Sequence, residues 1–166
     1  MKRQIWAIAL IAMLALVGCG GKSDDEPKKI VAVEGAEEDA YQTAVFAEQR
    51  IKWEALALQG DAPSQRQLGV MYYLGQGMEL DYEIAYGWLG KAANQGDDVA
   101  QMFLGVMNAE GQGVPQDSAA AHMWFSLSAQ QGNKNARIHL DKLIPQMTPE
   151  EIAEAETVAE NWKPSY

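Results

Sequence analysis

The sequence predicts an all-α solenoid of stacked helix pairs, and three observations predict it. A segment of 36 residues occurs twice in succession without a gap, apolar residues recur at helical spacing inside each copy, and aspartate and glycine stand where helices would begin and end. Self-similarity at a period of 20–50 residues is typical of solenoids. The 166-residue chain is long enough for one such domain with a core of its own.

The first 18 residues predict a signal peptide that is not part of this domain. Lys2 and Arg3 precede an apolar run over residues 5–17, which is short for a membrane span of about 20 residues. The run ends in Leu-Val-Gly-Cys, which resembles the lipobox of bacterial lipoproteins. The resemblance implies that Cys19 carries the lipid and becomes the first residue of the mature chain. An incidental cysteine behind an ordinary signal peptide is the alternative.

Residues 19–38 predict a lipidated, flexible tether, because they are rich in glycine and charge. The apolar patch 30–33 leaves open a short strand or a docking segment. Gly20 and Gly21 follow the cysteine, whereas aspartate there signals retention in the inner membrane. We therefore expect an outer-membrane location facing the periplasm, with the membrane contacted only through the lipid on Cys19.

The charge of the mature chain excludes nucleic acid as a natural partner. Removal of Lys2 and Arg3 leaves 11 basic residues against 23 acidic ones, a net charge of −12. Such a chain repels nucleic acids and anionic lipid headgroups alike. Cys19 is the only cysteine, so the sequence offers no internal disulfide and no cysteine metal site.

The repeat domain is predicted over residues 39–163, and its first element is a helix over 39–59. Apolar residues at helical spacing predict the face of this helix that packs beneath the first repeat. These residues are Ala44, Ala47, Ile51, Ala55 and Leu58.

Two full repeats are predicted over residues 61–96 and 97–132, which are identical at 15 of 36 positions. In each repeat an aspartate can cap the first helix, two glycines end it, and a second aspartate can cap the next helix. Gly69 and Gly105 lie inside the first helix, where glycine costs about 1 kcal/mol relative to alanine. We therefore expect a second helix to approach these glycines closely, with Trp88 or Trp124 as the bulky neighbour.

Residues 133–163 predict a partial unit and a C-terminal capping helix. Ala136, Leu140 and Leu143 continue the register of the preceding first helices, but no Gly-x-Gly follows them. Thr148-Pro149-Glu150-Glu151 instead forms a capping box, and the acidic helix behind it suits the end of a solenoid.

The two repeats resemble the Sel-one-like repeat (SLR), which is related to the tetratricopeptide repeat (TPR). The resemblance covers residues 61–132 and includes Leu-Gly-Val-Met, Gly-Gln-Gly and the tryptophan of the second helix. It implies a right-handed α/α superhelix that binds protein or peptide partners.

No catalytic constellation, cofactor site or metal site is predicted. The two histidines, His122 and His139, occur without a spaced motif that would bind metal. The serines lack a motif that links them to a histidine or a lysine, and Gly75-Gln76-Gly77 lacks the lysine of a phosphate loop.

Partner-binding residues are predicted at Tyr73, Tyr86, Asn108 and His122, where the two repeats differ. Tyrosine is favoured at interaction hot spots, although packing against a neighbouring helix is the alternative for Tyr73. The sequence thus predicts a non-catalytic protein-protein interaction scaffold anchored to the bacterial cell envelope. A module that grips peptidoglycan or another glycan is the alternative, and a cell-wall hydrolase is less favoured.

Overall fold

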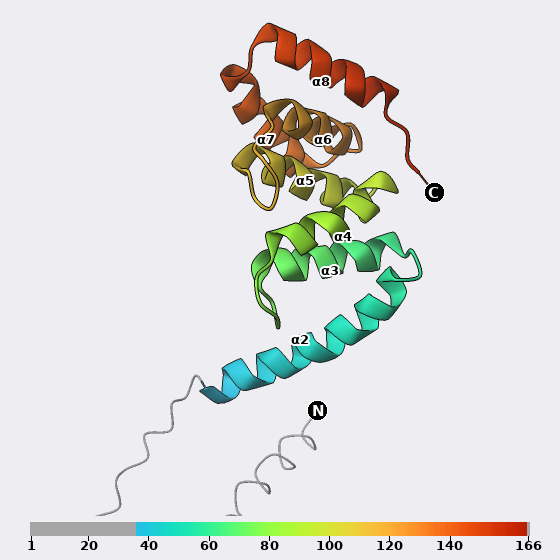
Figure 1. The fold of residues 1–166 in the computed structure, drawn as a ribbon, viewed down its shortest axis with the longest axis vertical. Coiled ribbons are helices and arrows are strands. Elements are labelled where there is room, and N and C mark those ends of the chain that lie inside the picture. Colours follow the sequence, from blue (N-terminus) through green and yellow to red (C-terminus); the bar gives the residue numbers. More distant parts are fainter. Residues whose placement is uncertain (1–35, 166) are drawn as a thin grey trace, which may run out of the picture. The chain divides into compact units, whose positions relative to one another are not determined.

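Seven α-helices follow one another along residues 36–165, the part of the chain that the computed structural model describes (Figure 1). They are α2 (Ala36–Ala57), α3 (Ala62–Leu74), α4 (Tyr82–Asn94), α5 (Asp98–Glu110), α6 (Ser118–Gln130), α7 (Lys134–Leu143) and α8 (Pro149–Asn161), with a 3₁₀ turn, η1 (Ile144–Gln146), before the last. No strand occurs among these residues, which confirms the all-α prediction. The signal peptide and Cys19 lie outside the described residues, and α2 begins at Ala36, inside the segment predicted as a tether.

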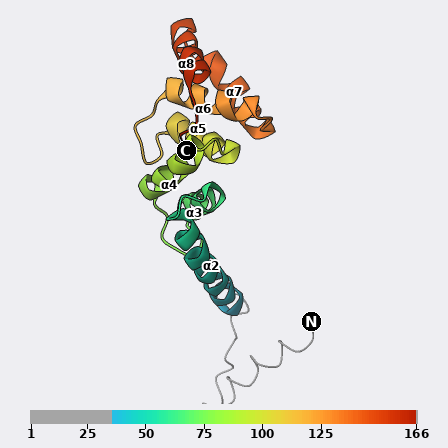
Figure 2. The ribbon, with the colours of Figure 1, turned by 90° about the vertical axis from the view of Figure 1, so that its right-hand side faces the viewer.

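The helices pack as pairs in chain order. The closest packing joins α3 to α4 and α5 to α6, and α4 also packs on α5 and α6 on α7. Successive helices lie side by side in both views of the ribbon (Figure 1 and Figure 2). The two pairs α3/α4 and α5/α6 are the two predicted repeats.

Aspartate and asparagine begin the first helix of each unit in the same way. Asp61, Asp97 and Asn133 each accept a hydrogen bond from the backbone N–H three residues ahead, at 2.9, 2.9 and 3.1 Å. These side chains satisfy an N–H group that has no partner within the helix. The predicted cap at Thr148 is also present, as a complete capping box.

The glycine pairs end the first helices as predicted. Gly75 and Gly111 have φ of 66° and 70°, the left-handed conformation that glycine adopts without steric cost. The loops behind them close with equivalent hydrogen bonds, from Asp81 N–H to the carbonyl of Tyr72 (3.0 Å) and from Asp117 N–H to the carbonyl of Asn108 (2.9 Å).

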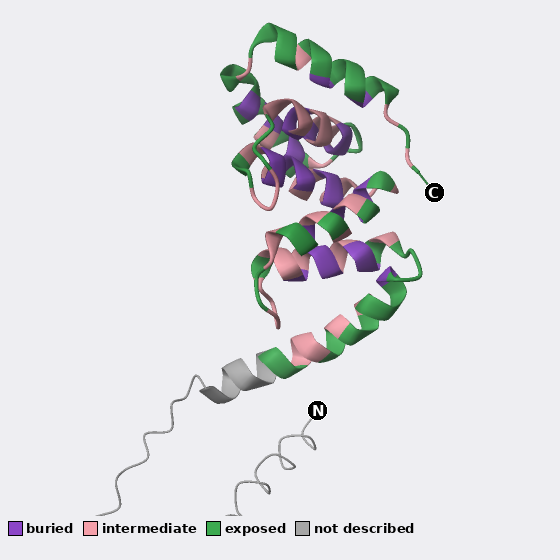
Figure 3. Cartoon of the chain, viewed as in Figure 1, coloured by how far each residue is buried: buried purple, intermediate pink, exposed green. Residues whose placement is uncertain are grey.

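The core lies between the helices of a pair and between neighbouring pairs, as the buried residues in Figure 3 show. It is built from alanine, leucine and methionine, with Phe125 as its largest fully buried side chain. One cluster contains Leu89, Leu104 and Met107, and the next contains Phe125, Leu140 and Leu143.

Glutamines join the two helices of each repeat and also join each repeat to the helix before it. The side-chain amide of Gln95 donates to Gln65 (2.8 Å), and that of Gln131 donates to Gln101 (2.7 Å). Gln65 and Gln101 in turn donate to the backbone carbonyls of Ala57 and Ala93. A buried amide costs free energy unless it is hydrogen-bonded, so the bonds from Gln65 and Gln101 to the preceding helix help to fix the register between units.

The close approach at Gly69 and Gly105 is real, but the predicted tryptophan neighbour was wrong. A Cβ atom on Gly69 would overlap Leu89, and one on Gly105 would overlap the ring of Phe125. Leu89 and Phe125 each follow the tryptophan by one residue, which rotates the side chain by about 100° around the helix. Trp124 is half-buried and instead lies edge-on to Trp162, with ring centroids 6.3 Å apart.

The predicted packing face of α2 was also wrong. Ile51 and Leu58 are 64% and 72% exposed, whereas Phe46 lies against Gly77 in the loop after α3, and Ala57 is buried beside α3, where its carbonyl accepts a hydrogen bond from Gln65. Ala57 and Ala93 occupy equivalent places 36 residues apart, so α2 stands where the second helix of a unit stands. Since no first helix of that unit packs on its other side among the described residues, the apolar stripe of α2 faces outward.

Candidate interaction surfaces

The first helices of the three units, α3, α5 and α7, line a groove with a cavity of about 350 Å³. Met102 and Phe103 of α5 occupy the same repeat positions as Ile138 and His139 of α7, and Tyr73 adds a ring from the end of α3. The lining residues are Tyr73 from α3, Met102, Phe103 and Val106 from α5, and Asn135, Ile138 and His139 from α7.

Aromatic rings form one end of this groove. Tyr73 contacts Phe103 edge-on, with centroids 5.2 Å apart, and Tyr82 with centroids 5.4 Å apart. Burial raises the pKa of Tyr73, and the carboxylate of Glu110 raises it further. The phenol therefore stays protonated and can donate a hydrogen bond at neutral pH.

The α7 side of the groove is apolar and open. Ile138 is 51% exposed, which is unusual for a residue so close to the core. The ring of His139 stacks nearly parallel on the ring of Phe125, with centroids 5.2 Å apart. This contact with a core residue holds the imidazole in position. The groove thus offers rigid rings and an exposed aliphatic side chain, which are features of protein-binding surfaces.

The four predicted partner-binding residues do not form one surface. Tyr73 lines the groove between the first helices. Tyr86 and Asn108 come together elsewhere, where the side-chain amide of Asn108 donates to the Tyr86 hydroxyl (3.3 Å) and to the backbone carbonyl of Leu104 (2.8 Å). Asn108 is only 4% exposed, so its amide serves the interior rather than a docking surface.

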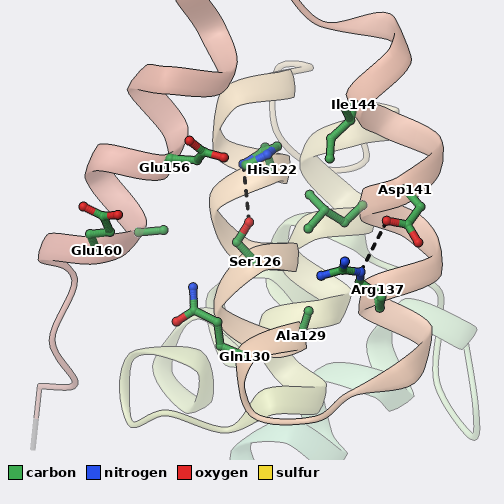
Figure 4. A pocket seen from close by; sticks show the side chains of 11 residues that line it. His122, Ser126, Ala129, Gln130, Arg137, Asp141, Ile144, Glu156 and Glu160 are labelled. Carbon is green, nitrogen blue, oxygen red and sulfur yellow. Dashed lines mark hydrogen bonds and ion pairs between the residues drawn. The ribbon is translucent and has the colours of Figure 1, made fainter. Parts of the chain in front are cut away.

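His122 lines a second cavity, of about 520 Å³, between α6, α7 and α8 (Figure 4). The residue is 2% exposed, and its Nδ1 lies 3.4 Å from the hydroxyl of Ser126. Burial lowers the pKa of His122, although the nearby carboxylate of Glu156 opposes this. The imidazole is therefore neutral at pH 7.

Sequence reasoning missed Phe103, Ile138 and His139 as groove residues. A signal for two of them was present, because Phe103 and His139 occupy the same position of successive units and differ in side chain. Nothing in the spacing shows that this position faces a groove, since that depends on where α3 and α7 lie.

Neither a membrane-spanning helix nor a metal-binding cluster occurs in the described part of the chain. None of the helices over residues 36–161 has the length and apolar character needed to cross a bilayer. Over the same residues, no three side chains of histidine, cysteine, aspartate or glutamate come together in a group that could hold a metal ion.

Helix pairs that repeat every 36 residues with equivalent caps, turns and inter-unit hydrogen bonds define the class of α-solenoid repeat proteins. Within this class, the family model of the Sel1 repeat matches residues 62–97 and 98–133. The chain therefore contains two Sel1 repeats, which confirms the resemblance seen in its sequence. No curated protein matches the chain in sequence.

Two solved structures share the fold. A protective antigen of uropathogenic Escherichia coli strains, described as displaying an SLR fold, superposes with a TM-score of 0.68 and 23% identity, over 78% of this chain and 30% of the antigen. A Sel1 repeat protein from Oxalobacter formigenes superposes with a TM-score of 0.56 and 24% identity, over 79% of this chain and 54% of its own. The present chain thus spans from about a third to about half of the length of these relatives.

Proposed function

We propose that this chain is a non-catalytic interaction scaffold of the bacterial cell envelope, and that the groove between α3, α5 and α7 binds a protein partner. The observation that carries the proposal is the groove itself. Three successive units contribute rings and aliphatic side chains to one continuous surface, with Tyr73, Phe103 and Ile138 as its main members. Solenoids use such extended surfaces for binding, and Sel1 repeats generally mediate protein-protein interaction.

The physical character of the groove favours a polypeptide segment as the occupant. Aromatic side chains provide a large contact area at a small cost in conformational entropy, and hot spots are enriched in them. Because the Tyr73 ring is held by two neighbouring rings, it need not reorder on binding. Exposed Ile138 supplies apolar area that a partner would remove from water.

The envelope location rests on the first 21 residues. A basic start, a short apolar run and Cys19 at the lipobox position support export followed by lipidation. Stable anchoring requires more than one acyl chain, which lipidation of the cysteine thiol and of the new amino terminus would supply. Gly20 and Gly21 favour sorting to the outer membrane, with the repeats in the periplasm.

Ile138→Glu should weaken partner binding at least tenfold, because it places a charge in the apolar groove. The partner would first be captured from detergent-solubilised membranes with the wild-type chain, identified by mass spectrometry, and purified for a titration by calorimetry. The thermal midpoint should change little, since the side chain is half exposed in the free protein.

Ile84→Glu is the matched control, because Ile84 is an exposed isoleucine on α4 outside the groove. Equal loss of binding in both variants would contradict the proposed surface. Retention of the chain on purified peptidoglycan, abolished by Ile138→Glu, would favour the glycan-binding alternative instead.

Cys19→Ala should abolish lipidation, because the thiol is the nucleophile that accepts the lipid. Metabolic labelling with a fatty-acid analogue measures this directly, and Ser23→Ala serves as the control substitution. Persistent labelling of the Cys19→Ala protein would refute the lipoprotein prediction without affecting the proposed groove.

A further inference from the structure

The cavity between α6, α7 and α8 exists because the third unit breaks the repeat at two positions. Asp141 stands where the first two units have Gly69 and Gly105, and Arg137 stands where they have Gln65 and Gln101. In the complete units a second helix packs tightly against the glycine. A side chain at that position prevents such packing, so α8 packs on α6 rather than on α7.

The result is a cleft where the second helix of a complete unit would lie. Figure 4 shows α7 with Arg137 and Asp141 on one side, α8 with Glu156 and Glu160 on the other, and α6 between them. Its volume of about 520 Å³ lies within the range of about 300–1,000 Å³ found for ligand sites. Apolar side chains complete the lining, namely Ala129, Leu140, Ile144 and Ala159.

The charges of the cleft are unbalanced. Arg137 Nε is already paired with Asp141 Oδ1 at 3.3 Å, within one helix. Glu156 and Glu160 form no ion pair among the described residues. They lie four residues apart on one face of α8, in its last two turns, where carboxylates repel each other and the helix dipole disfavours negative charge.

A buried polar group also lines the cleft. His122 is 2% exposed, and its neutral imidazole bonds at Nδ1 only to Ser126, another lining residue. Its other ring nitrogen has no hydrogen-bond partner among residues 36–165. The fully buried side-chain atoms without a partner among the described residues are Arg50 Nε and Gln112 Oε1, so this ring nitrogen keeps some exposure to the cleft and can exchange a hydrogen bond with a guest.

We propose that this cleft binds a lysine or arginine side chain of a partner polypeptide. The apolar lining receives the methylene stem, Glu156 and Glu160 pair with the cationic group, and a ring nitrogen of His122 exchanges a hydrogen bond with the guest. The inference does not depend on the proposed groove. Arg137, Leu140 and Asp141 lie on the opposite face of α7 from Ile138 and His139, by helical spacing.

The test is a titration of the full chain at 0.15 M salt with a blocked pentapeptide that contains two lysines, compared with the same peptide carrying glutamines. Ring signals of His122 and His139 are followed by NMR. We expect the lysine peptide to shift the His122 signal and leave that of His139 unchanged, and the glutamine peptide to shift neither.

Three variants separate a built site from general attraction to an acidic protein. Glu156→Gln with Glu160→Gln should weaken binding of the lysine peptide at least tenfold. Glu150→Gln with Glu154→Gln makes the same charge change on α8 outside the cleft and should alter affinity less than twofold. Ala129→Leu keeps every charge but fills the cleft, and should also weaken binding at least tenfold.

Equal losses in the two glutamine pairs, or unchanged binding by Ala129→Leu, would overturn the inference. Binding of spermidine as tight as that of the peptide would overturn the assignment to a polypeptide side chain. Circular dichroism of each variant verifies that the fold is retained, and variants that lose helicity would be replaced by the milder Ala129→Val.

Discussion

Phe125→Ala should lower the free energy of unfolding by about 3–5 kcal/mol, the range for removing a buried aromatic ring. Phe125 is 1% exposed and lies in one cluster with Ala136, Leu140 and Leu143. Its ring contacts Gly105 of α5 and stacks on His139 of α7, so it joins three helices. The loss is measured by urea denaturation followed by circular dichroism.

Trp124→Ala is the control, because the larger ring lies one residue away on the same helix. Trp124 is half-buried, and its described ring contact is with Trp162 near the end of the chain. We expect a loss of less than about 2 kcal/mol, since a smaller share of its surface is removed from water on folding. A loss for Trp124→Ala that matched the loss for Phe125→Ala would contradict this assignment of the core.

Helix boundaries could be predicted because the groups that set them are close in sequence. Asp61 and Asp97 cap their own helices through the third residue ahead, and Gly75 and Gly111 end theirs through their own φ. The recurrence of these signals after 36 residues identified both the repeat and its family. Neither inference required knowledge of how the helices pack.

The packing faces could not be predicted as well, because they depend on neighbours distant in sequence. The stripe with Ile51 and Leu58 has the spacing of a buried face, yet it is exposed because α3 is the one helix of residues 36–165 that packs closely on α2. In the same way, tryptophan is the more conspicuous repeated residue, but the geometry of the pair directs Leu89 and Phe125 at the glycines.

The candidate surfaces were predicted in part. Tyr73 was identified from a difference between the repeats, and it lines the groove. That its ring contacts a partner remains a prediction. Position 108 also differs between the repeats, but the difference there serves the interior of the protein. Asn108 is buried and its side-chain amide bonds to the hydroxyl of Tyr86. Variation between units therefore reports two causes, adaptation to a partner and adaptation of the core, which only the structure separates. The cleft beside α8 was not predicted, since it results from a helix that does not pack where the repeat would place it.

Gly113→Ala should lower the free energy of unfolding by about 2–5 kcal/mol, because two costs coincide. Gly113 has φ of 71°, where a side chain costs about 1–2 kcal/mol. A Cβ atom there would also lie 2.5 Å from the carbonyl carbon of Tyr82 and 2.8 Å from the amide nitrogen of Glu83. These are backbone atoms at the start of α4 and cannot rotate away, so overpacking adds about 1–3 kcal/mol.

Gly132→Ala separates the two costs, because Gly132 has φ of 95° but a Cβ atom added there would meet no atom within 4 Å. We expect it to lose only about 1–2 kcal/mol, from backbone strain alone. The difference between the two variants, measured by urea denaturation, reports the contact between the α5–α6 loop and the start of α4. Gly77 makes the equivalent approach to Phe46 of α2, so this contact occurs in both complete repeats and sets how closely they stack on the preceding helix. Equal losses at Gly113 and Gly132 would show that the second glycine of each loop is required for its backbone conformation alone, and that the stacking distance is set elsewhere.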